Sequence, residues 1–232
     1  MKILAIIPSR SGSKGIKNKN LKKITGKKSL IEHTYDIAKK SNIFDKIIVS
    51  TDSNFYKQYL QKKKIIINFL RPKKLSKDYV SDLEVIKYEL KRYEKFYDTN
   101  FQYVCLLQPT SPLRKISHLR ECLKKLTNQK LDAIWTISKI SSKFNPIKIL
   151  KVKDNLLSYN DSKGSEFISR QLLENCYIRN GVAYFISKKS ILEKNTILPK
   201  KTGYVVIKDR LVNIDTLEEL KEARRYLNKW NT

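Results

Sequence analysis

What this 232-residue chain lacks already excludes several classes of protein. It has only three cysteines, Cys105, Cys122 and Cys176, which are odd in number and widely spaced, so neither a disulfide framework nor a zinc site of the C-x-x-C type is expected. Long apolar runs are also missing. The run that begins at Ile3 stops at Pro8, which is far too short to span a membrane or to form a signal-peptide core. We therefore expect a soluble, cytoplasmic protein with reduced thiols and no membrane partner.

Glycine and proline are few, six of each, and acidic residues are outnumbered by basic ones, 22 against 49. With 41% hydrophobic and 10% aromatic residues, this composition is typical of a globular chain rather than a disordered one. The net charge of +27 suggests nucleic-acid binding as one interpretation. However, 39 of the basic residues are lysines spread along the whole chain, which indicates a drift in composition rather than a dedicated binding patch. We therefore expect no nucleic-acid partner, and we expect the ten arginines to lie where a planar, bidentate donor is required.

Short apolar runs alternate with amphipathic stretches along the chain. The runs are β-branched and bounded by polar or turn residues, which predicts buried strands over residues 3–8, 46–50, 65–70, 103–108 and 133–140. Apolar residues at helical spacing predict helices over residues 29–40, 53–64, 82–96 and 117–126. Ser81 and Glu84 predict a capping box at the start of the third helix. The alternation predicts an α/β fold, a Rossmann-like and mostly parallel sheet with helices on both faces.

The pattern changes after residue 140. Residues 141–177 form a polar, irregular stretch with a predicted hairpin around Asp154–Asn155, and a segment of this length inside a compact domain is usually functional or bound to a partner. Strands are predicted again over residues 181–187 and 204–207, followed by a helix that ends near residue 229 and is capped by Asp215 or Thr216. We therefore expect one domain over residues 1–232, with an inserted arm at 141–177.

The loop after the first strand, residues 9–20, reads "SRSGSKGIKNKN" and matches neither the P-loop nor the dinucleotide fingerprint. Parallel sheets bind ligands beyond the carboxyl ends of their strands, which is where this loop is expected to lie. Its glycines allow the backbone amides to face an anion, and Arg10, Lys14 and Lys19 supply positive charge. From spacing alone, a phosphate-binding loop and an exposed basic loop are about equally well supported.

Other post-strand segments also allow two interpretations. In "LLQPTSPLR", residues 106–114, two prolines stiffen the loop and would hold Gln108 and Thr110 in fixed directions, although a stiff connector explains the same residues slightly better. Arg71 is either a site residue at a strand end or a surface arginine. Asp215, taken alone, is explained more readily as a helix cap than as a metal ligand. The two histidines, His33 and His118, have no identifiable Ser or Cys partner and are assigned to structure.

Six segments taken together resemble the bacterial acylneuraminate cytidylyltransferases, the CMP-sialic acid synthetases, over roughly residues 3–227. In order they are "IPSRSGSKGIKNKNL", "DKIIVSTD", "LRPKKLSKD", "LLQPTSPLR", "RNGVAY" and "NIDT". The first segment and "LQPTSPLR" are specific to this group and its close relatives, whereas "RNG" and "IDT" are weaker alone. The CMP-Kdo synthetases have a different opening loop and rank second. The resemblance implies a dimeric enzyme that couples CTP, with Mg²⁺, to the anomeric hydroxyl of a nine-carbon 2-keto acid sugar and releases pyrophosphate.

The resemblance also implies roles for the matching residues. Nucleotide binding is expected at Arg10, Ser13, Lys14, Lys19, Asn20, Arg71, Asp82 and Thr110. Sugar binding is expected at Gln108, Lys148, Arg170, Asn180 and Tyr184, with Lys148 donated across a dimer by the arm. Asp215 is expected to bind Mg²⁺, with Asn213 beside it. Arg10, Lys14 and Asp215 are the expected catalytic residues: Lys14 or Arg10 would stabilise the charge that develops in the reaction, and Asp215 would anchor the metal near the α-phosphate.

Two departures from the family pattern bear on the metal and the sugar. Asn213 stands where many members have a first aspartate, and the lost charge should weaken Mg²⁺ binding or shift the ion toward the substrate phosphates. Ile178 stands where some members have an arginine, with Arg179 next to it, so the sugar could be legionaminic, pseudaminic or N-acetylneuraminic acid. The competing interpretations are a transferase for another sugar and nucleotide, and a non-catalytic basic module that binds nucleic acid or an anionic polymer.

Overall fold

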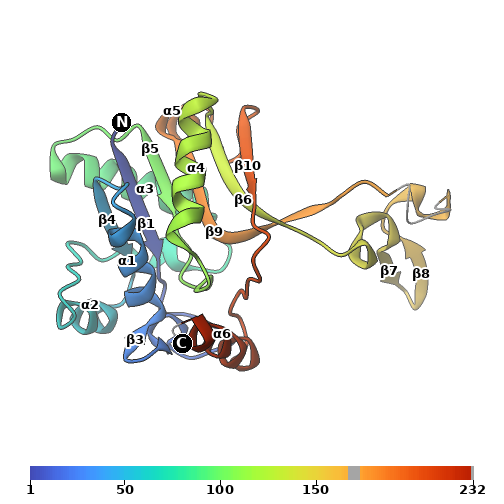
Figure 1. The fold of residues 1–232 in the computed structure, drawn as a ribbon, viewed down its shortest axis with the longest axis horizontal. Coiled ribbons are helices and arrows are strands. Elements are labelled where there is room, and N and C mark those ends of the chain that lie inside the picture. Colours follow the sequence, from blue (N-terminus) through green and yellow to red (C-terminus); the bar gives the residue numbers. More distant parts are fainter. Residues whose placement is uncertain (167–172, 231–232) are drawn as a thin grey trace.

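A six-stranded sheet organises the body of the molecule, and Figure 1 shows an arm that extends from one side of it. The structure is a computed structural model that describes residues 1–166 and 173–230. The strands lie in the order β10-β6-β9-β5-β1-β4. Their bounds are β1 Ile3–Pro8, β4 Lys46–Ser50, β5 Tyr103–Leu106, β6 Ala133–Lys139, β9 Tyr177–Ser187 and β10 Thr202–Val206. Strand β9 is antiparallel to both neighbours and the other adjacent pairs are parallel, so the predicted mostly parallel sheet is confirmed.

Helices cover both faces of this sheet, as the alternation of patterns predicts. They are α1 Leu30–Ser41, α2 Asn54–Gln61, α3 Asp82–Tyr97, α4 Ile116–Asn128 and α5 Lys188–Leu192, whereas α6 Leu217–Trp230 packs apart from the sheet. From β1, Ile3, Ala5 and Ile7 pack in one apolar cluster with α1, α2 and α4, whereas Leu4 and Ile6 pack in a second with α3 and α5. Because successive side chains of a strand point to opposite faces, the two clusters are the two layers of the core.

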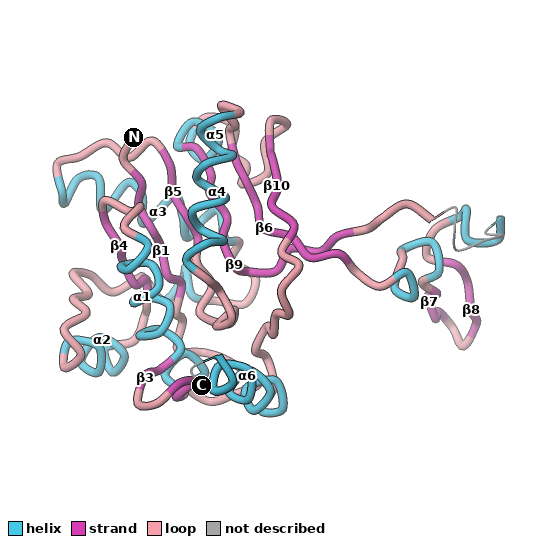
Figure 2. Tube along the Cα trace, viewed as in Figure 1, coloured by secondary structure: helices cyan, strands magenta, loops and turns pink. Residues whose placement is uncertain are grey.

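The C-terminal helix, α6, packs against segments from the first 30 residues of the chain. Figure 2 shows α6 beside the small hairpin of β2 (Lys23–Thr25) and β3 (Lys28–Ser29). A third apolar cluster contains Leu220 and Ala223 of α6 together with Ile16 of the opening loop and Leu113. This packing places the end of the chain against the loop that follows β1.

Local capping signals explain where two of the helices begin. Ser29 and Glu32 form a capping box at the start of α1. The predicted box at Ser81 and Glu84 is confirmed, with the Glu84 amide donating to Ser81 Oγ (3.2 Å) and the Ser81 amide donating to Glu84 Oε2 (2.9 Å). Both boxes satisfy amides that the helix itself leaves unpaired, and so they fix the first residue of the helix.

The arm leaves the body between β6 and β9 and carries the predicted hairpin. The short helical turns are η3 Ser142–Phe144, η4 Pro146–Lys148 and η5 Ser162–Glu166, and the strands are β7 Leu150–Lys153 and β8 Leu156–Tyr159. Asp154 and Asn155 link the two strands with φ of 51° and 60°, the conformation that two-residue hairpin turns require. In the described ranges no helix is both long and apolar enough to cross a membrane.

The prediction of a strand over residues 65–70 is wrong. Ile65 and Ile67 are buried and Ile66 is 71% exposed, so the segment has the alternation of a strand. It has no place in the hydrogen-bonded sheet, whose edge strand is β4. Instead it leads to the Arg71 amide, which donates to Thr51 O just beyond β4 (2.7 Å). Burial of alternate residues does not by itself show that a ladder partner exists.

Candidate functional site

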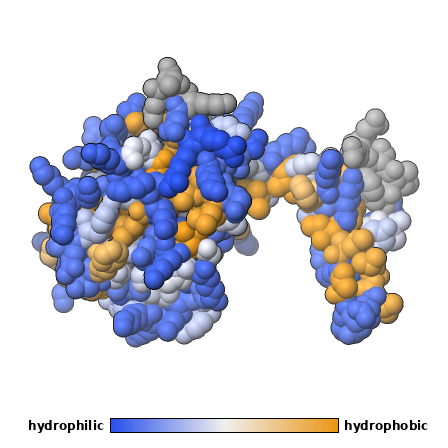
Figure 3. All heavy atoms as spheres, turned by 90° about the horizontal axis from the view of Figure 1, so that it is seen from below, coloured by the Kyte–Doolittle hydropathy of each residue, from blue (hydrophilic) through white to orange (hydrophobic). Residues whose placement is uncertain are grey.

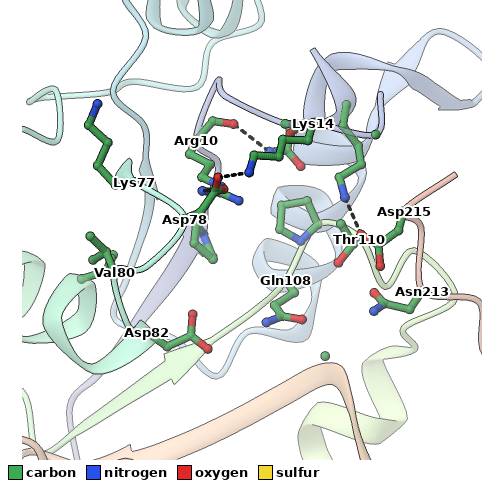
Figure 4. Close-up of a pocket in the computed structure, with 18 of the residues that line it drawn as sticks. Arg10, Lys14, Lys77, Asp78, Val80, Asp82, Gln108, Thr110, Asn213 and Asp215 are labelled. Carbon is green, nitrogen blue, oxygen red and sulfur yellow. Dashed lines mark hydrogen bonds and ion pairs between the residues drawn. The ribbon is translucent and has the colours of Figure 1, made fainter. Parts of the chain in front are cut away.

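A cavity of about 590 Å³ lies where β1 and β5 end, at the edge of the sheet where ligands of such folds bind. Five separate stretches of chain contribute to it, and Figure 4 labels side chains from four of them, all except the middle of β9. They are the opening loop, the loop before α3, the segment after β5, the middle of β9 and the segment before α6. Their residues are Pro8, Arg10, Ser13, Lys14, Gly15, Lys19, Asn20, Arg71, Leu75, Lys77, Asp78, Val80, Asp82, Val85, Gln108, Pro109, Thr110, Arg179, Gly181, Tyr184, Asn213 and Asp215.

The opening loop is held in shape by its neighbours. The amide and hydroxyl of Ser11 donate to the two carboxylate oxygens of Asp52, at 2.9 and 3.0 Å. A Cβ on Gly15 would lie 2.5 Å from the main-chain oxygen of Asp215, so the loop passes too close to the segment before α6 for any side chain at this position. Asn20 Oδ1 is buried and has no hydrogen-bond partner among the residues that the structure describes. The loop is therefore a shaped element rather than a free basic segment.

Two cations of this loop converge on one carboxylate. Arg10 Nη1 lies 2.6 Å from Asp78 Oδ1 and Lys14 Nζ lies 2.7 Å from Asp78 Oδ2, as the dashed lines in Figure 4 show. Hydrogen bonds from Lys14 and Arg10 hold the pKa of Asp78 below its ordinary value. Both side chains thus already stabilise negative charge at one point inside the cavity. An anionic ligand at that point would have to compete with Asp78.

Asp215 faces the cavity and is not the cap of the last helix. Glu219 Oε2 accepts from the amides of Asp215 and Thr216 (both 2.8 Å), and the Glu219 amide donates to Thr216 Oγ1 (3.2 Å). Thr216 and Glu219 therefore form the capping box, which resolves the two alternatives that the sequence left open. The Asp215 side chain is 68% exposed, and its Oδ1 accepts a hydrogen bond from Lys19 Nζ (2.7 Å).

The metal-binding potential of this segment is limited to oxygen ligands. Asn213 lines the cavity two residues before Asp215, and the intervening Ile214 amide donates to Thr110 O (2.9 Å), which anchors the segment to the loop after β5. Among residues 1–166 and 173–230 no cluster of three or more His, Cys, Asp or Glu side chains could hold a metal by itself. Carboxylate and carbonyl oxygens are the ligands that Mg²⁺ prefers, and it commonly completes its shell with substrate phosphates.

The opposite wall is formed by the segments that contain Gln108 and Tyr184. Gly181 has φ +73° and its Cα lies so close to Gln108 that a Cβ would be 2.5 Å from Oε1. The Gly181 amide donates to Tyr184 Oη (2.5 Å), and burial raises the pKa of this phenol. Arg179 Nη1 lies 3.8 Å from Asp82 Oδ2 at the rim. These contacts arrange a hydroxyl, an amide and a guanidinium along one side of the cavity.

Arg71 is not a surface arginine. It is 4% exposed, and its Nε donates to Ser76 Oγ (3.0 Å). Burial lowers its pKa, while the nearby carboxylates of Glu89 and Asp52 act in the opposite direction. A buried guanidinium that lines the cavity supports the interpretation that Arg71 belongs to the site.

Most of the residues expected from the sequence come together here, two of the described ones do not, and one lies outside the described residues. The cavity brings together Arg10, Ser13, Lys14, Lys19, Asn20, Arg71, Asp82, Gln108, Thr110, Tyr184, Asn213 and Asp215. Asn180 does not line it, because its side chain bonds Thr136 Oγ1 (2.7 Å) and Ser138 Oγ (3.0 Å) of β6. This amide thus links β9 to β6, and its expected sugar contact stays a prediction. Lys148 lies in η4 on the arm, and Arg170 lies outside the described residues.

Three charged residues of the cavity were not among the predicted site residues, although the resemblance matched residues 78–82 to the family's nucleotide-side loop and Arg179 was noted beside Ile178. Lys77 and Asp78 come from "LRPKKLSKD", and Arg179 stands next to the Asn-Gly pair. All three lie in segments that the sequence pointed to, but nothing local distinguishes Lys77 and Asp78 from the other charged residues of that loop. Lys77 forms no ion pair in the part of the chain that the structure describes, and Figure 4 shows its side chain pointing away from Gln108 and Asp215.

Comparison with known proteins identifies the family. A family profile described as cytidylyltransferase matches residues 4–230. The chain belongs to the cytidylyltransferase family. It is 32% identical, over 94% of its length, to an N-acylneuraminate cytidylyltransferase of Streptococcus agalactiae, and 32% identical over 99% to one of Escherichia coli. The chain spans about half the length of these two relatives, 52% and 53%.

Relatives of about its own size act on other sugars by name. The chain is 29% identical to the CMP-N,N'-diacetyllegionaminic acid synthase of Campylobacter jejuni, over 88% of this chain and 86% of that one. The solved structure of CMP:2-keto-3-deoxy-manno-octonic acid synthetase in complex with CTP has the same fold, with a TM-score of 0.68 over 99% of both chains at 18% identity. The predicted nucleotidyltransferase-type fold is thus confirmed.

Proposed function

We propose that this chain transfers a cytidylyl group from CTP to the anomeric hydroxyl of an acidic, sialic-acid-like 2-keto sugar. The observation that carries the proposal is the composition of the two sides of one cavity. The opening loop contributes cations to the lining, the segments with Gln108 and Tyr184 contribute polar groups, and Asp215 accepts a hydrogen bond from Lys19 of the loop. The names of the relatives, several of which are cytidylyltransferases for acidic sugars, support the same reaction.

In the proposed reaction the oxygen of the sugar hydroxyl attacks the α-phosphorus of CTP. An O–P bond forms, the bond to the bridging oxygen breaks, pyrophosphate leaves and the hydroxyl loses its proton. Arg10, Lys14 and Lys19 would bind the triphosphate, and Arg10 and Lys14 would stabilise the charge that develops on it. Asn20, with an unpartnered buried oxygen, and Arg71 would contribute on the same side.

Asp215 and Asn213 fit a magnesium ion that is shared with the nucleotide. They offer a carboxylate and a carbonyl oxygen on one side of the cavity, too few ligands to hold the ion without phosphate oxygens. When bound, Mg²⁺ would neutralise phosphate charge and make pyrophosphate a better leaving group. Lys19 holds one oxygen of Asp215 and so orients the carboxylate.

The arm supports the proposal of a homodimer. In the hairpin, Leu150 pairs with Tyr159 and Val152 pairs with Leu157, so the four side chains share one face. Their exposed fractions are 49%, 48%, 72% and 70%, and Figure 3 shows the resulting apolar surface on the arm. A two-stranded hairpin cannot bury an apolar face by itself, and exposed apolar patches commonly mark protein interfaces. A second copy of the chain would cover this face and bring Lys148 to the partner's sugar site.

One assay tests the reaction. CTP, UTP, ATP and GTP are each incubated with Mg²⁺ and N-acetylneuraminic acid, legionaminic acid, pseudaminic acid or Kdo, and pyrophosphate release is measured. We expect release with CTP and at least one nine-carbon acid. Release with Kdo alone would indicate the second-ranked sugar, and release with another nucleotide would contradict the proposal. Salt-sensitive binding to DNA or RNA without any release would favour the basic binding module instead. The proposed compartment is the cytoplasm.

A further inference from the structure

Arg114 is a buried cation that the proposed reaction does not use. It ends the proline-rich loop after β5 and is 2% exposed. Its guanidinium donates to three main-chain oxygens, from Nε to Val182 (2.5 Å) and from Nη2 to Gln108 (2.7 Å) and Gly181 (3.0 Å). Across the described residues it forms no ion pair with a carboxylate, and Nη1 has no hydrogen-bond partner. A buried arginine without an acidic partner is uncommon, because buried charges are normally paired.

The described surroundings of Arg114 compensate its charge with carbonyl groups alone and supply no carboxylate. Burial lowers its pKa to about 10, so the guanidinium stays protonated at neutral pH. The ionisable groups that face it are His33 on α1, Cys105 on β5, His118 on α4 and Tyr184 on β9. Burial raises the pKa of the thiol and of the phenol, and so neither carries negative charge at neutral pH. A charge in such low-dielectric surroundings acts over a longer distance than an exposed one.

The guanidinium lies directly behind the wall of the cavity. Gln108 and Gly181, whose carbonyl groups it binds, both line the cavity, and the Gln108 amide also donates to Gly181 O (3.3 Å). Ser111 Oγ adds a bond to Asn180 O (2.8 Å) between the same two segments. Arg114 therefore both ties the loop after β5 to β9 and places a positive charge on the far side of the wall.

We infer that Arg114 is a positioning residue for an acidic substrate. It fixes the Gln108 and Gly181 segments and, without touching the ligand, favours a carboxylate on the cavity side of the wall. This role rests on the proposed function, since it assumes that the acidic sugar lies against this wall. It differs from the role of Arg10 and Lys14, which lie across the cavity and are paired with Asp78.

The test uses a variant at position 114 that loses its positive charge when the pH is raised. A buried lysine has a lowered pKa, so in Arg114→Lys the positive charge should be lost between about pH 7 and about pH 9, whereas the native arginine keeps it. Pyrophosphate release at saturating CTP gives KM for the preferred acid of the four named above. We expect this KM to rise about fivefold more over that pH range in Arg114→Lys than in the unsubstituted chain, while KM for CTP changes by less than about twofold.

Three further variants separate charge from scaffold. Arg114→Met removes the charge at every pH and should raise KM for the acid about tenfold at neutral pH. Ser111→Ala loosens the same loop without changing its charge, and should show no pH-dependent change in KM beyond that of the unsubstituted chain. Arg120→Met removes an arginine charge from the exposed surface of α4 and should leave both KM values unchanged.

A uniform loss would overturn the inference. If Arg114→Lys and Arg114→Met lower kcat and raise both KM values by the same factor at every pH, Arg114 serves the fold alone. Should Arg114→Met fail to fold, the lysine variant still decides, because pH changes its charge within one folded protein. If the unsubstituted chain releases no pyrophosphate with any of the acids, the proposed function is wrong and the inference falls with it, a result that needs no variant.

Discussion

The two sides of the cavity are built in opposite ways. On the opening-loop side, charged side chains bind one another at the surface: the Lys14 side chain is 84% exposed, that of Arg10 is 37% exposed, and both pair with Asp78. On the Gln108–Tyr184 wall the contacts are main-chain hydrogen bonds, a glycine that admits no side chain, and the buried Arg114. Exposed ion pairs contribute little and exchange partners readily, whereas packed contacts do not. The first side suits a flexible polyanion, and the second suits a ligand of fixed shape.

The largest effect should come from Asp215, where the two sides meet. Asp215→Ala removes the carboxylate that the proposed Mg²⁺ needs, and we expect turnover to fall by about 10²–10³-fold. The fold should be little affected, because Thr216 and Glu219 keep the cap of α6. Thr216→Val is the matched control: it should cost about 1 kcal/mol of stability and leave turnover near normal. Near-normal turnover in Asp215→Ala would remove this residue from the mechanism.

Disrupting the arm should affect binding of the acid at the Gln108–Tyr184 wall more than binding of CTP at the opening loop. Val152→Asp with Leu157→Asp places charges on the apolar face of the hairpin, and light scattering should show a monomer instead of a dimer. KM for the acid should rise about tenfold, because Lys148 would no longer reach the partner, while KM for CTP should change little. Two aspartates on the opposite face, in Lys151→Asp with Ser158→Asp, should leave the dimer intact even though they change the net charge more. A dimer that persists in the first variant would show that another surface holds the two copies together.

Gly181→Ala tests whether the wall is as rigid as its contacts indicate. The new Cβ would lie 2.5 Å from Gln108 Oε1 and from Ser111 Oγ at a positive φ, so Gln108 must move. We expect a loss of about 1–3 kcal/mol in thermal unfolding and a KM for the acid that rises about fivefold. Gly26→Ala is matched for positive φ but meets no atom within 4 Å, and it should lower stability without changing KM. Equal kinetics in the two variants would indicate a wall that adapts.

The smallest effect is expected at Asp78, where a substitution should improve nucleotide binding rather than weaken the enzyme. Asp78→Asn removes the competitor for Arg10 and Lys14, so KM for CTP should fall about threefold. Since the pKa of Asp78 lies below its ordinary value of 3.8, the aspartate competes throughout the neutral range, and its ion pairs are lost only as pH falls through that lowered pKa. Asp132→Asn, which breaks a remote surface pair with Lys194, should leave KM unchanged. A higher KM for CTP in Asp78→Asn would mean that Asp78 orders the loop rather than blocking it.

Local signals carried most of the fold. The bounds of β1 and β4 agree with their apolar runs, and α3 begins where its capping box predicts, because strand burial and helix capping depend on neighbouring residues. The prediction of a strand over residues 65–70 was wrong because a strand also depends on residues that are distant in the sequence. A strand forms only where another strand lies beside it, and the alternation of buried and exposed residues carries no information on such a partner. Residues 65–70 have the alternation but belong to no sheet.

The site shows the same limit. Arg10 and Asp215 were found through family motifs, but the pairing of Arg10 with Asp78 joins two loops that no local pattern connects. The motif around Asn180 points to the right turn, but only the structure shows that the Asn180 side chain bonds to β6 while Gly181 and Arg179 line the cavity. The burial of Arg114 depends on carbonyl groups of β9 about 70 residues away, which a sequence read locally cannot reveal.

The close approach of Gly15 to Asp215 has a consequence for biosynthesis. Two hundred residues separate the partners of this contact, so a growing polypeptide has the loop long before it has the segment that the loop rests on. Until the ribosome has added the segment around Asp215 and the helix α6 that follows it, the opening loop has no packing contact at Gly15. A product cut short before residue 213 should therefore accumulate without activity, even if its sheet assembles.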